Sequence, residues 1–188
     1  GPAIPLASQL GNLPKGVHRI DLEIKQASVS GAAGAKKATV VYRILKDGKP
    51  VTLNRAGQLI DRVDGTPDIY IAYAIPRDGI AAPADWNATI NAHINDIRDG
   101  KNGNSQTGPD AEGFYTARLG ATVPDAAKMV TAGLGINYDG FVQLNLPEYP
   151  KGIRLREPKF VMKVADGYTG RRAIVDSNKC RSCHGAEG

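Results

Sequence analysis

Cysteine, aromatic residues and long apolar segments are all scarce in this chain. Cys180 and Cys183 are the only cysteines among 188 residues, which excludes a scaffold held together by several disulfides. Aromatic residues make up only 6% of the sequence, so aliphatic side chains must build most of the core. No run of about 18 apolar residues occurs, and the sequence therefore predicts no membrane-spanning helix.

The common catalytic motifs are also missing. The sequence has no G-x-S-x-G nucleophile elbow, no H-E-x-x-H zinc motif and no phosphate-binding P-loop. Its three histidines, His18, His93 and His184, are scattered along the chain. These absences give little support to a hydrolase or a conventional metal-dependent enzyme, and no residue is assigned a catalytic role.

Short alternating segments dominate the part of the sequence that does show a pattern. Ile20, Leu22 and Ile24 alternate with charged residues, which is typical of a half-buried strand. Asp47-Gly48 is a strong hairpin turn signal after another such segment. With 22 glycines and 12 prolines, the chain is suited to many short strands joined by turns. We expect strands at 20–25, 38–45, 51–53, 68–75, 113–119, 128–134, 140–146 and 159–164.

One segment between these strands has helical spacing. Asp85 is a plausible N-cap, and apolar residues follow it at intervals of three to four. We therefore expect one short amphipathic helix over residues 86–98. The predicted fold class is all-β, mainly antiparallel: a Greek-key split β-barrel or β-sandwich with this single helix and a separate C-terminal tail.

The tail is predicted from the most informative motif of the chain, Cys180-Arg181-Ser182-Cys183-His184. C-x-x-C-H is the attachment signature of c-type haem. Cys180 and Cys183 would form thioethers to the haem vinyl groups, and His184 would be the proximal ligand of the iron. The motif predicts one covalently attached haem c as the cofactor.

Three other interpretations of the two cysteines are weaker. A zinc site would need two further ligands, and only His18, His93 and carboxylates are available. A thioredoxin-like pair should open a helix within a βαβ unit, whereas here few residues follow the motif. A plain disulfide, or free thiols, would remain if haem were never attached.

The charge of the chain is positive but dispersed. Lys and Arg exceed Asp and Glu by 24 to 19, and the sequence pI is about 9.2. Only short clusters such as Lys36-Lys37 and Arg171-Arg172 occur, whereas nucleic-acid binding requires a basic stripe or a reader motif. We expect no nucleic-acid partner; the excess charge would offset haem propionates or steer acidic partners.

Four segments resemble the N-terminal region of the OmcA/MtrC family of decahaem c-type cytochromes. They are 74–87 (AIPRDGIAAPADWN), 107–115 (TGPDAEGFY), 163–172 (KVADGYTGRR) and 174–184 (IVDSNKCRSCH). The last is the most specific, because family members join their leading β-domain to the first haem motif through a similar phrase. The resemblance implies a haem-free Greek-key or split β-barrel domain, over residues 17–165, that precedes a series of haems.

That family works outside the outer membrane of metal-reducing bacteria, where its haems pass electrons to ferric minerals, flavins or other external acceptors. The resemblance implies the same electron-transfer role for the parent of this chain, with other haem domains and a porin–cytochrome conduit as partners. It also implies export to the extracellular face of the outer membrane, with the periplasm as second choice. The chain begins without a signal peptide, so we expect that a leader was removed.

This chain departs from the family in having one haem motif where the family has ten. It is expected to be either a piece of a longer cytochrome or a short relative with one haem. We divide it into a leader segment 1–16, the β-domain 17–165, and a linker with the haem motif at 166–188. The alternative function is a docking module of a cytochrome complex, in which the β-domain itself has no redox role.

The family generally holds its haem iron between two histidines, so a distal histidine is expected beside His184. His93 and His18 are the only candidates in this chain. Met129 and Met162 can also ligate haem iron, but both stand in strand patterns that favour a place in the core. A distal ligand from a neighbouring chain, or an open position, is the other alternative.

Overall fold

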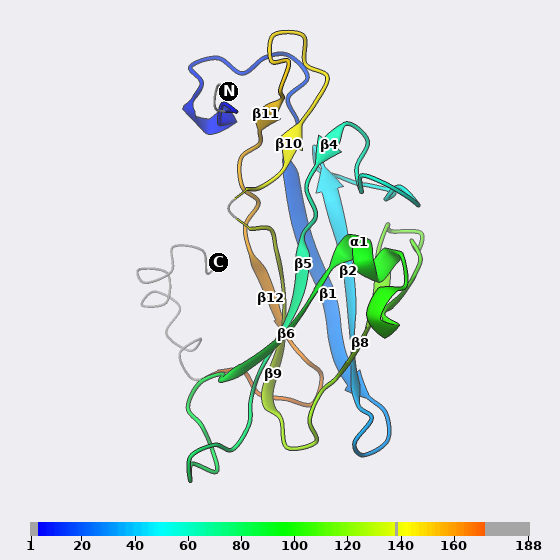
Figure 1. Cartoon of the computed structure of the whole chain (residues 1–188), viewed down its shortest axis with the longest axis vertical. Coiled ribbons are helices and arrows are strands. Elements are labelled where there is room, and N and C mark those ends of the chain that lie inside the picture. Colours follow the sequence, from blue (N-terminus) through cyan, green and yellow to red (C-terminus); the bar gives the residue numbers. More distant parts are fainter. Residues whose placement is uncertain (1–3, 138, 172–188) are drawn as a thin grey trace.

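Two antiparallel β-sheets face each other in the computed structural model, which describes residues 4–137 and 139–171. The first sheet has the strand order β1-β2-β8-β7, with β3 paired to the end of β2. Figure 1 shows β1 and β2 as the longest strands of the molecule. The bounds are β1 Ile20–Ser30, β2 Lys37–Lys46, β3 Lys49–Pro50, β7 Ser105–Thr107 and β8 Tyr115–Thr122.

The second sheet has the order β12-β9-β5-β6, with β9 and β5 in its centre. Its edge strands are β6 on one side and β12 on the other, and β12 packs beside β1 of the first sheet. Every pairing between named strands is antiparallel in the described chain. The bounds are β5 Asp68–Ala74, β6 Ala88–His93, β9 Lys128–Gly135 and β12 Val161–Val164.

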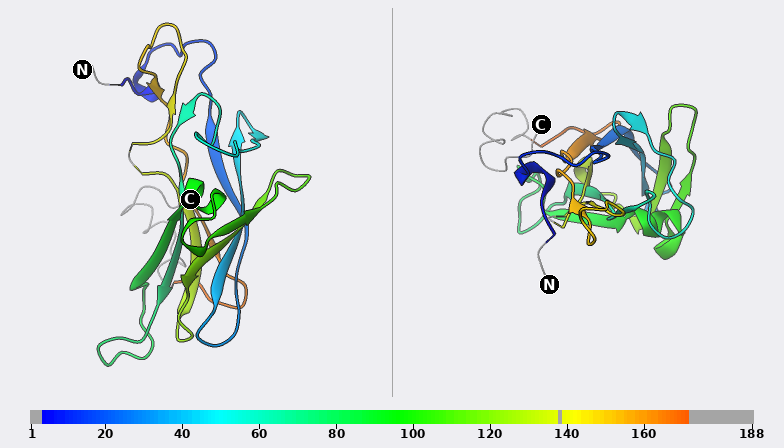
Figure 2. Two further views of the ribbon diagram at one scale, coloured as in Figure 1. Left: turned by 45° about the vertical axis from the view of Figure 1, so that its right-hand side comes forward. Right: turned by 90° about the horizontal axis from the view of Figure 1, so that it is seen from above.

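A small third sheet lies at the end of the sandwich from which β1 starts (Figure 1). It consists of β4 Val63–Asp64, β10 Val142–Gln143 and β11 Ile153–Arg154. The N-terminal segment joins it through a bridge between Leu6 and Arg154, next to a 3-10 turn, η1, at Ala7–Gln9. Figure 2 shows this part of the chain continuing the long axis of the sandwich.

The path of the chain between the two main sheets is a Greek key. β5, β6, β7 and β8 follow one another around the sandwich, and β9 then returns to pair with β5. Between β6 and β7 the chain passes from one sheet to the other through α1, Ile94–Arg98, and the 3-10 turn η2, Lys101–Gly103. The described strands form no closed barrel, since neither β6 and β7 nor β1 and β12 are paired. The predicted all-β, mainly antiparallel sandwich is therefore confirmed.

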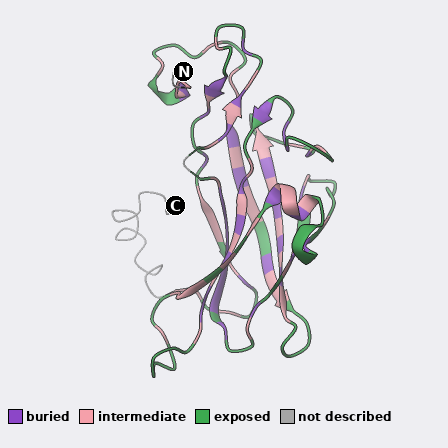
Figure 3. Cartoon of the chain, in the orientation of Figure 1, coloured by how far each residue is buried: buried purple, intermediate pink, exposed green. Residues whose placement is uncertain are grey.

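The core lies between the sheets because the long strands alternate apolar and polar residues. In β2, Val40, Tyr42 and Ile44 are buried while their neighbours are partly exposed. Ile69 and Ile71 of β5 face them from the other sheet as members of the same apolar cluster. Figure 3 shows the resulting purple bands of buried residues along the strands. Burial raises the pKa of the Tyr42 phenol, which donates a hydrogen bond to Gln106 Oε1 at 2.5 Å.

The predicted helix over 86–98 is wrong for most of its length. Residues Ala88–His93 form strand β6, and only Ile94–Arg98 are helical. Asp85 is not an N-cap of this helix, because the helix begins at Ile94 and the residue before it is His93. Ala88, Ile90 and Ala92 alternate with polar residues, so the same apolar spacing satisfies a strand once β5 offers an edge.

Two predicted strands are also displaced or shortened. The partner of β2 after the Asp47-Gly48 turn is Lys49–Pro50 rather than 51–53. The strand predicted at 140–146 is a strand only at Val142–Gln143, and Leu146 adds an isolated bridge to Tyr149. The helices of the described chain are too short and too polar to cross a membrane, in agreement with the prediction from the sequence.

Candidate functional site

The predicted haem-attachment residues Cys180, Cys183 and His184 lie outside the described residues. Their role therefore stays a prediction from the sequence. What the structure does define is Arg171, the last described residue before them, and the surface around it. Cys180 follows Arg171 by nine positions.

Arg171 is held against the segment that joins β5 to β6. Its guanidinium lies 4.4 Å from the ring centroid of Trp86, and its Nη1 lies 3.5 Å from Asp85 Oδ1. The Arg171 side chain is only 11% exposed, and a partly desolvated guanidinium over an indole is a favourable cation–π contact. This contact fixes the place from which the haem-motif segment departs.

Trp86 is in turn anchored to the central strand β9. Its Nε1 donates a hydrogen bond to the Met129 carbonyl at 3.0 Å, and Thr131 Oγ1 donates to the same oxygen at 2.9 Å. Met129 lies at a bulge of β9 opposite β5 and has a φ of 54°. At this bulge two residues of β9 oppose one residue of β5. The Met129 carbonyl is therefore left to side-chain donors.

His93, the first candidate for the distal ligand, is the last residue of β6. Its ring Nδ1 hydrogen-bonds to Asp68 Oδ1 on the paired strand β5, and its side chain is 54% exposed. A carboxylate on one ring nitrogen is the usual arrangement of a metal-binding histidine, because it orients the ring and leaves the other nitrogen to the metal. The surroundings of His93 therefore suit a ligand role.

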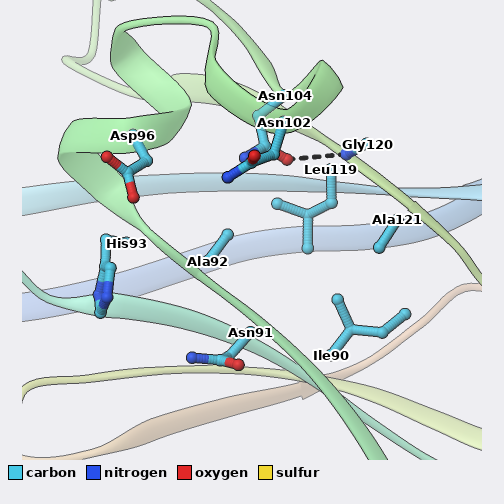
Figure 4. A pocket seen from close by; sticks show the side chains of 10 residues that line it. All are labelled: Ile90, Asn91, Ala92, His93, Asp96, Asn102, Asn104, Leu119, Gly120 and Ala121. Atoms are coloured by element: carbon cyan, nitrogen blue, oxygen red, sulfur yellow. Dashed lines mark hydrogen bonds between the residues drawn. The ribbon is translucent and has the colours of Figure 1, made fainter.

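His93 also lines a cavity of about 290 Å³ on the open side of the sandwich. Figure 4 shows His93 and Asp96 at one end of this cavity, with Ile90 and Ala121 at the other. The lining comes from β6, α1, η2 and β8, so the cavity lies where the edges of the two sheets approach each other without pairing. Asn104 closes part of it by accepting a hydrogen bond from the Gly120 N–H at 2.7 Å.

His18, the second candidate, lies two positions before the first residue of β1 and contacts Gln143 of β10. Its Nδ1 lies 2.6 Å from Asp47 Oδ2, and its backbone N–H donates to Gln143 Oε1 at 2.8 Å. The Arg19 N–H lowers the pKa of Asp47 most, and the hydrogen bond from His18 adds to this. The structure gives His18 and His93 different carboxylate partners and does not bring them to one site.

The remaining candidate ligands are two methionines on different parts of the second sheet. Met129 is 9% exposed, as its strand pattern predicts. Met162 of β12 is half-buried and lines a surface cavity. Within residues 4–137 and 139–171, no three His, Cys, Asp or Glu side chains gather in a way that could hold a metal ion.

The contact between Arg171 and Trp86 is the feature that sequence reasoning missed. The two residues are 85 positions apart, and neither an isolated tryptophan nor an Arg-Arg pair carries a pattern that predicts a partner. Comparison with protein-family models and with curated proteins finds no match for this chain.

Proposed function

We propose that this chain transfers electrons through one haem c, attached to Cys180 and Cys183 and ligated by His184, as the leading part of an extracellular multihaem cytochrome. The observation that carries the proposal is the C-x-x-C-H motif formed by the only two cysteines of the chain. The motif follows, by nine positions, a residue that is anchored on a β-domain of the kind the family resemblance implies.

The haem would supply one-electron chemistry, while the protein sets its potential through ligation, burial and hydrogen bonds. His184 would hold the haem iron as its proximal ligand. His93 is the better distal candidate within the chain, because its Nδ1 is held by Asp68 and its side chain is exposed enough to be reached. His18 is the second candidate, with Asp47 in the orienting role.

The proposed partners are the other haem domains of the same cytochrome, a porin–cytochrome conduit, and mineral or flavin acceptors. The proposed location is the extracellular face of the outer membrane, since c-type attachment in bacteria takes place after export. The net charge of +5 would favour association with negatively charged groups such as haem propionates and acidic protein surfaces.

The test is to export the chain in a bacterial host with a c-type maturation system and to record its absorption spectrum. The proposal predicts a sharp c-type α-band on reduction and a reversible one-electron titration. The matched control is Cys180→Ser with Cys183→Ser, which keeps the β-domain and should give neither signal. A colourless native chain, obtained while a known cytochrome matures in the same host, would refute the proposal.

The second candidate is a docking module without a redox role. It is favoured by the completeness of the sandwich, since buried residues from Ala7 to Ala165 of the described chain form one core. Cys180→Ala with Cys183→Ala separates the two functions. Binding of the variant to a conduit protein or to ferric oxide as tightly as the native chain would identify the β-domain as the binder.

A further inference from the structure

A polar pocket lies where β8 begins, between that strand, α1 and the loop that follows β3. We call it the tyrosine pocket; its volume is about 220 Å³. Its walls come from the loop 52–55, from Arg98 of α1, from Gln106 of β7 and from Tyr115 of β8. Two arginines, an amide and a phenol line it, and the described lining includes no acidic side chain. The lining is therefore suited to a ligand that accepts hydrogen bonds.

The phenol in this pocket is almost fully buried. Tyr115 is 6% exposed, and its oxygen accepts a hydrogen bond from the Leu53 N–H at 2.8 Å. The phenol keeps its own hydrogen to donate, and no residue of the described chain accepts it. Because a polar group at this depth is stable only with a partner, the Tyr115 O–H requires an acceptor from inside the pocket.

The side-chain amide of Gln106 is oriented by a second phenol. The Tyr42 O–H donates to Gln106 Oε1 at 2.5 Å, and the Tyr42 ring stacks on Tyr115 with 6.0 Å between the centroids. Since Tyr42 occupies Oε1, the Nε2 group remains to donate, and it has no acceptor among residues 4–137 and 139–171. Two neighbouring donors, Tyr115 O–H and Gln106 Nε2, are therefore open to a ligand.

The two arginines of the lining have different roles. The Arg98 side chain is 9% exposed, and its Nε lies 2.8 Å from Asp99 Oδ1, which balances its charge. Its Nη1 donates to the carbonyls of Asn54 and Gly57 at 3.0 and 2.9 Å, so Arg98 fixes the loop as a preformed wall. Arg55 is exposed and forms no ion pair with any described residue. The pocket therefore carries one uncompensated positive charge, at Arg55.

We propose that the tyrosine pocket binds a short-chain monocarboxylate. The carboxylate accepts hydrogen bonds from the Tyr115 O–H and from Gln106 Nε2, and the Arg55 guanidinium pairs with its charge. Hydrogen bonds to an ionised acceptor are about twice as strong as neutral ones, so these donors gain more from a carboxylate than from water. The site is independent of Cys180 and Cys183, because described residues form all of it.

The charge and the size of the pocket select this class of ligand. The single uncompensated charge of Arg55 matches a monoanion better than a phosphate dianion. Leu53 and Pro109 also line the pocket and give an alkyl group apolar contact. The volume of about 220 Å³ lies below the roughly 300–1,000 Å³ of pockets that enclose a drug-sized ligand. Only a carboxylate with a few carbons, such as acetate or propionate, therefore fits.

An NMR titration of the ¹⁵N-labelled chain with sodium acetate tests the proposal, with sodium chloride at the same ionic strength as the reference. The Leu53 backbone amide and the Gln106 side-chain amide should shift along one saturating curve, with a dissociation constant of about 1–10 mM. The midpoint of thermal unfolding should rise as the site fills. Phosphate that binds as tightly as acetate would overturn the assignment of a monocarboxylate.

Two substitutions remove the proposed donors separately. Gln106→Glu keeps an oxygen for Tyr42 and replaces the Nε2 donor by a second acceptor, so acetate should bind roughly tenfold or more weakly. Arg55→Gln removes the charge from an exposed loop position, where folding is not at risk, and should weaken binding in the same direction.

Arg156→Gln is the matched control, because Arg156 is an exposed arginine outside the pocket; it should leave acetate binding unchanged. Circular dichroism shows whether each variant is folded, and Arg55→Gln decides alone if Gln106→Glu is not. Shifts of the Leu53 and Gln106 amides that never saturate, or that saturate equally in the native and Arg55→Gln chains, would overturn the site. Either result leaves the proposed haem function untouched.

Discussion

The contact between Arg171 and Trp86 leads to the most specific prediction about the described chain. Replacing Arg171 by Ala removes a guanidinium that lies 4.4 Å from the indole centroid. Replacing Trp86 by Leu removes the ring and the Nε1 donor to Met129. If the two side chains interact as the structure indicates, each substitution should lower the free energy of unfolding by less in a chain that already carries the other substitution.

The size of this coupling follows from how far the pair is desolvated. The Arg171 side chain is 11% exposed and Trp86 is half-buried, which places the cation–π contact at about 1–2 kcal/mol. The ion pair with Asp85 adds little, because the nitrogen–oxygen distance is 3.5 Å and Asp85 is 59% exposed. We therefore expect a coupling free energy of roughly 1–1.5 kcal/mol between Arg171 and Trp86.

The assay is a double-mutant cycle in urea, followed by circular dichroism because Trp86 is the only tryptophan and is itself substituted. The cycle isolates the pair from the other contacts of each residue. Arg77→Ala is the matched control, because Arg77 lies near Trp86 but donates to the Asn87 carbonyl. Its free energy of unfolding should add to that of Trp86→Leu. Additive free energies for Arg171 and Trp86, within about 0.3 kcal/mol, would refute the cation–π contact as the anchor.

Three further predictions concern the sheet itself. Gly133→Ala should destabilise the fold by about 1–3 kcal/mol through overpacking against Phe160, and Phe160→Leu should relieve much of this in urea unfolding of the double variant. Asp47 has a lowered pKa, so its contribution to stability is present above the ordinary carboxyl pKa of about 3.9 and is lost as the pH falls through the lowered value. Between pH 6 and pH 2 the free energy of unfolding should therefore decline less in the Asp47→Asn chain than in the native chain. An equal decline in both chains would contradict this. Tyr115→Phe should lower the free energy of unfolding by about 1–3 kcal/mol, because the Leu53 N–H, which donates to the Tyr115 phenol at 2.8 Å, is left buried without an acceptor. A variant with the same midpoint of thermal unfolding as the native chain would show that this hydrogen bond contributes nothing.

The strands could be predicted from the sequence wherever polar and apolar residues alternate over a long segment. The alternation that starts at Ile20 and the turn at Asp47-Gly48 both correspond to structure, because one face of each long strand packs on the core. The segment 86–98 could not be assigned in the same way. Ile90 and Ile94 are four positions apart, a spacing that satisfies the helical and the strand period together, and pairing with β5 decides in favour of β6 up to His93.

The surroundings of the candidate site were beyond sequence reasoning for a different reason. The Met129 carbonyl that accepts hydrogen bonds from Trp86 and Thr131 becomes available through a bulge, and a bulge depends on how two strands match in length. The position of Arg171 likewise depends on the path of the chain after β12. Haem attachment at Cys180, Cys183 and His184 stays a prediction from five adjacent residues, whereas the contacts that hold Arg171 depend on tertiary structure.

The most direct test of the central claim is the intact mass of the exported chain under denaturing conditions, measured beside the Cys180→Ser/Cys183→Ser chain. Denaturation removes any haem that is merely bound, so only thioether attachment survives. The account predicts that the native chain carries the added mass of one haem and that the serine variant carries none. A native chain with the mass of its amino acids alone, made in a host that matures other c-type cytochromes, would contradict it.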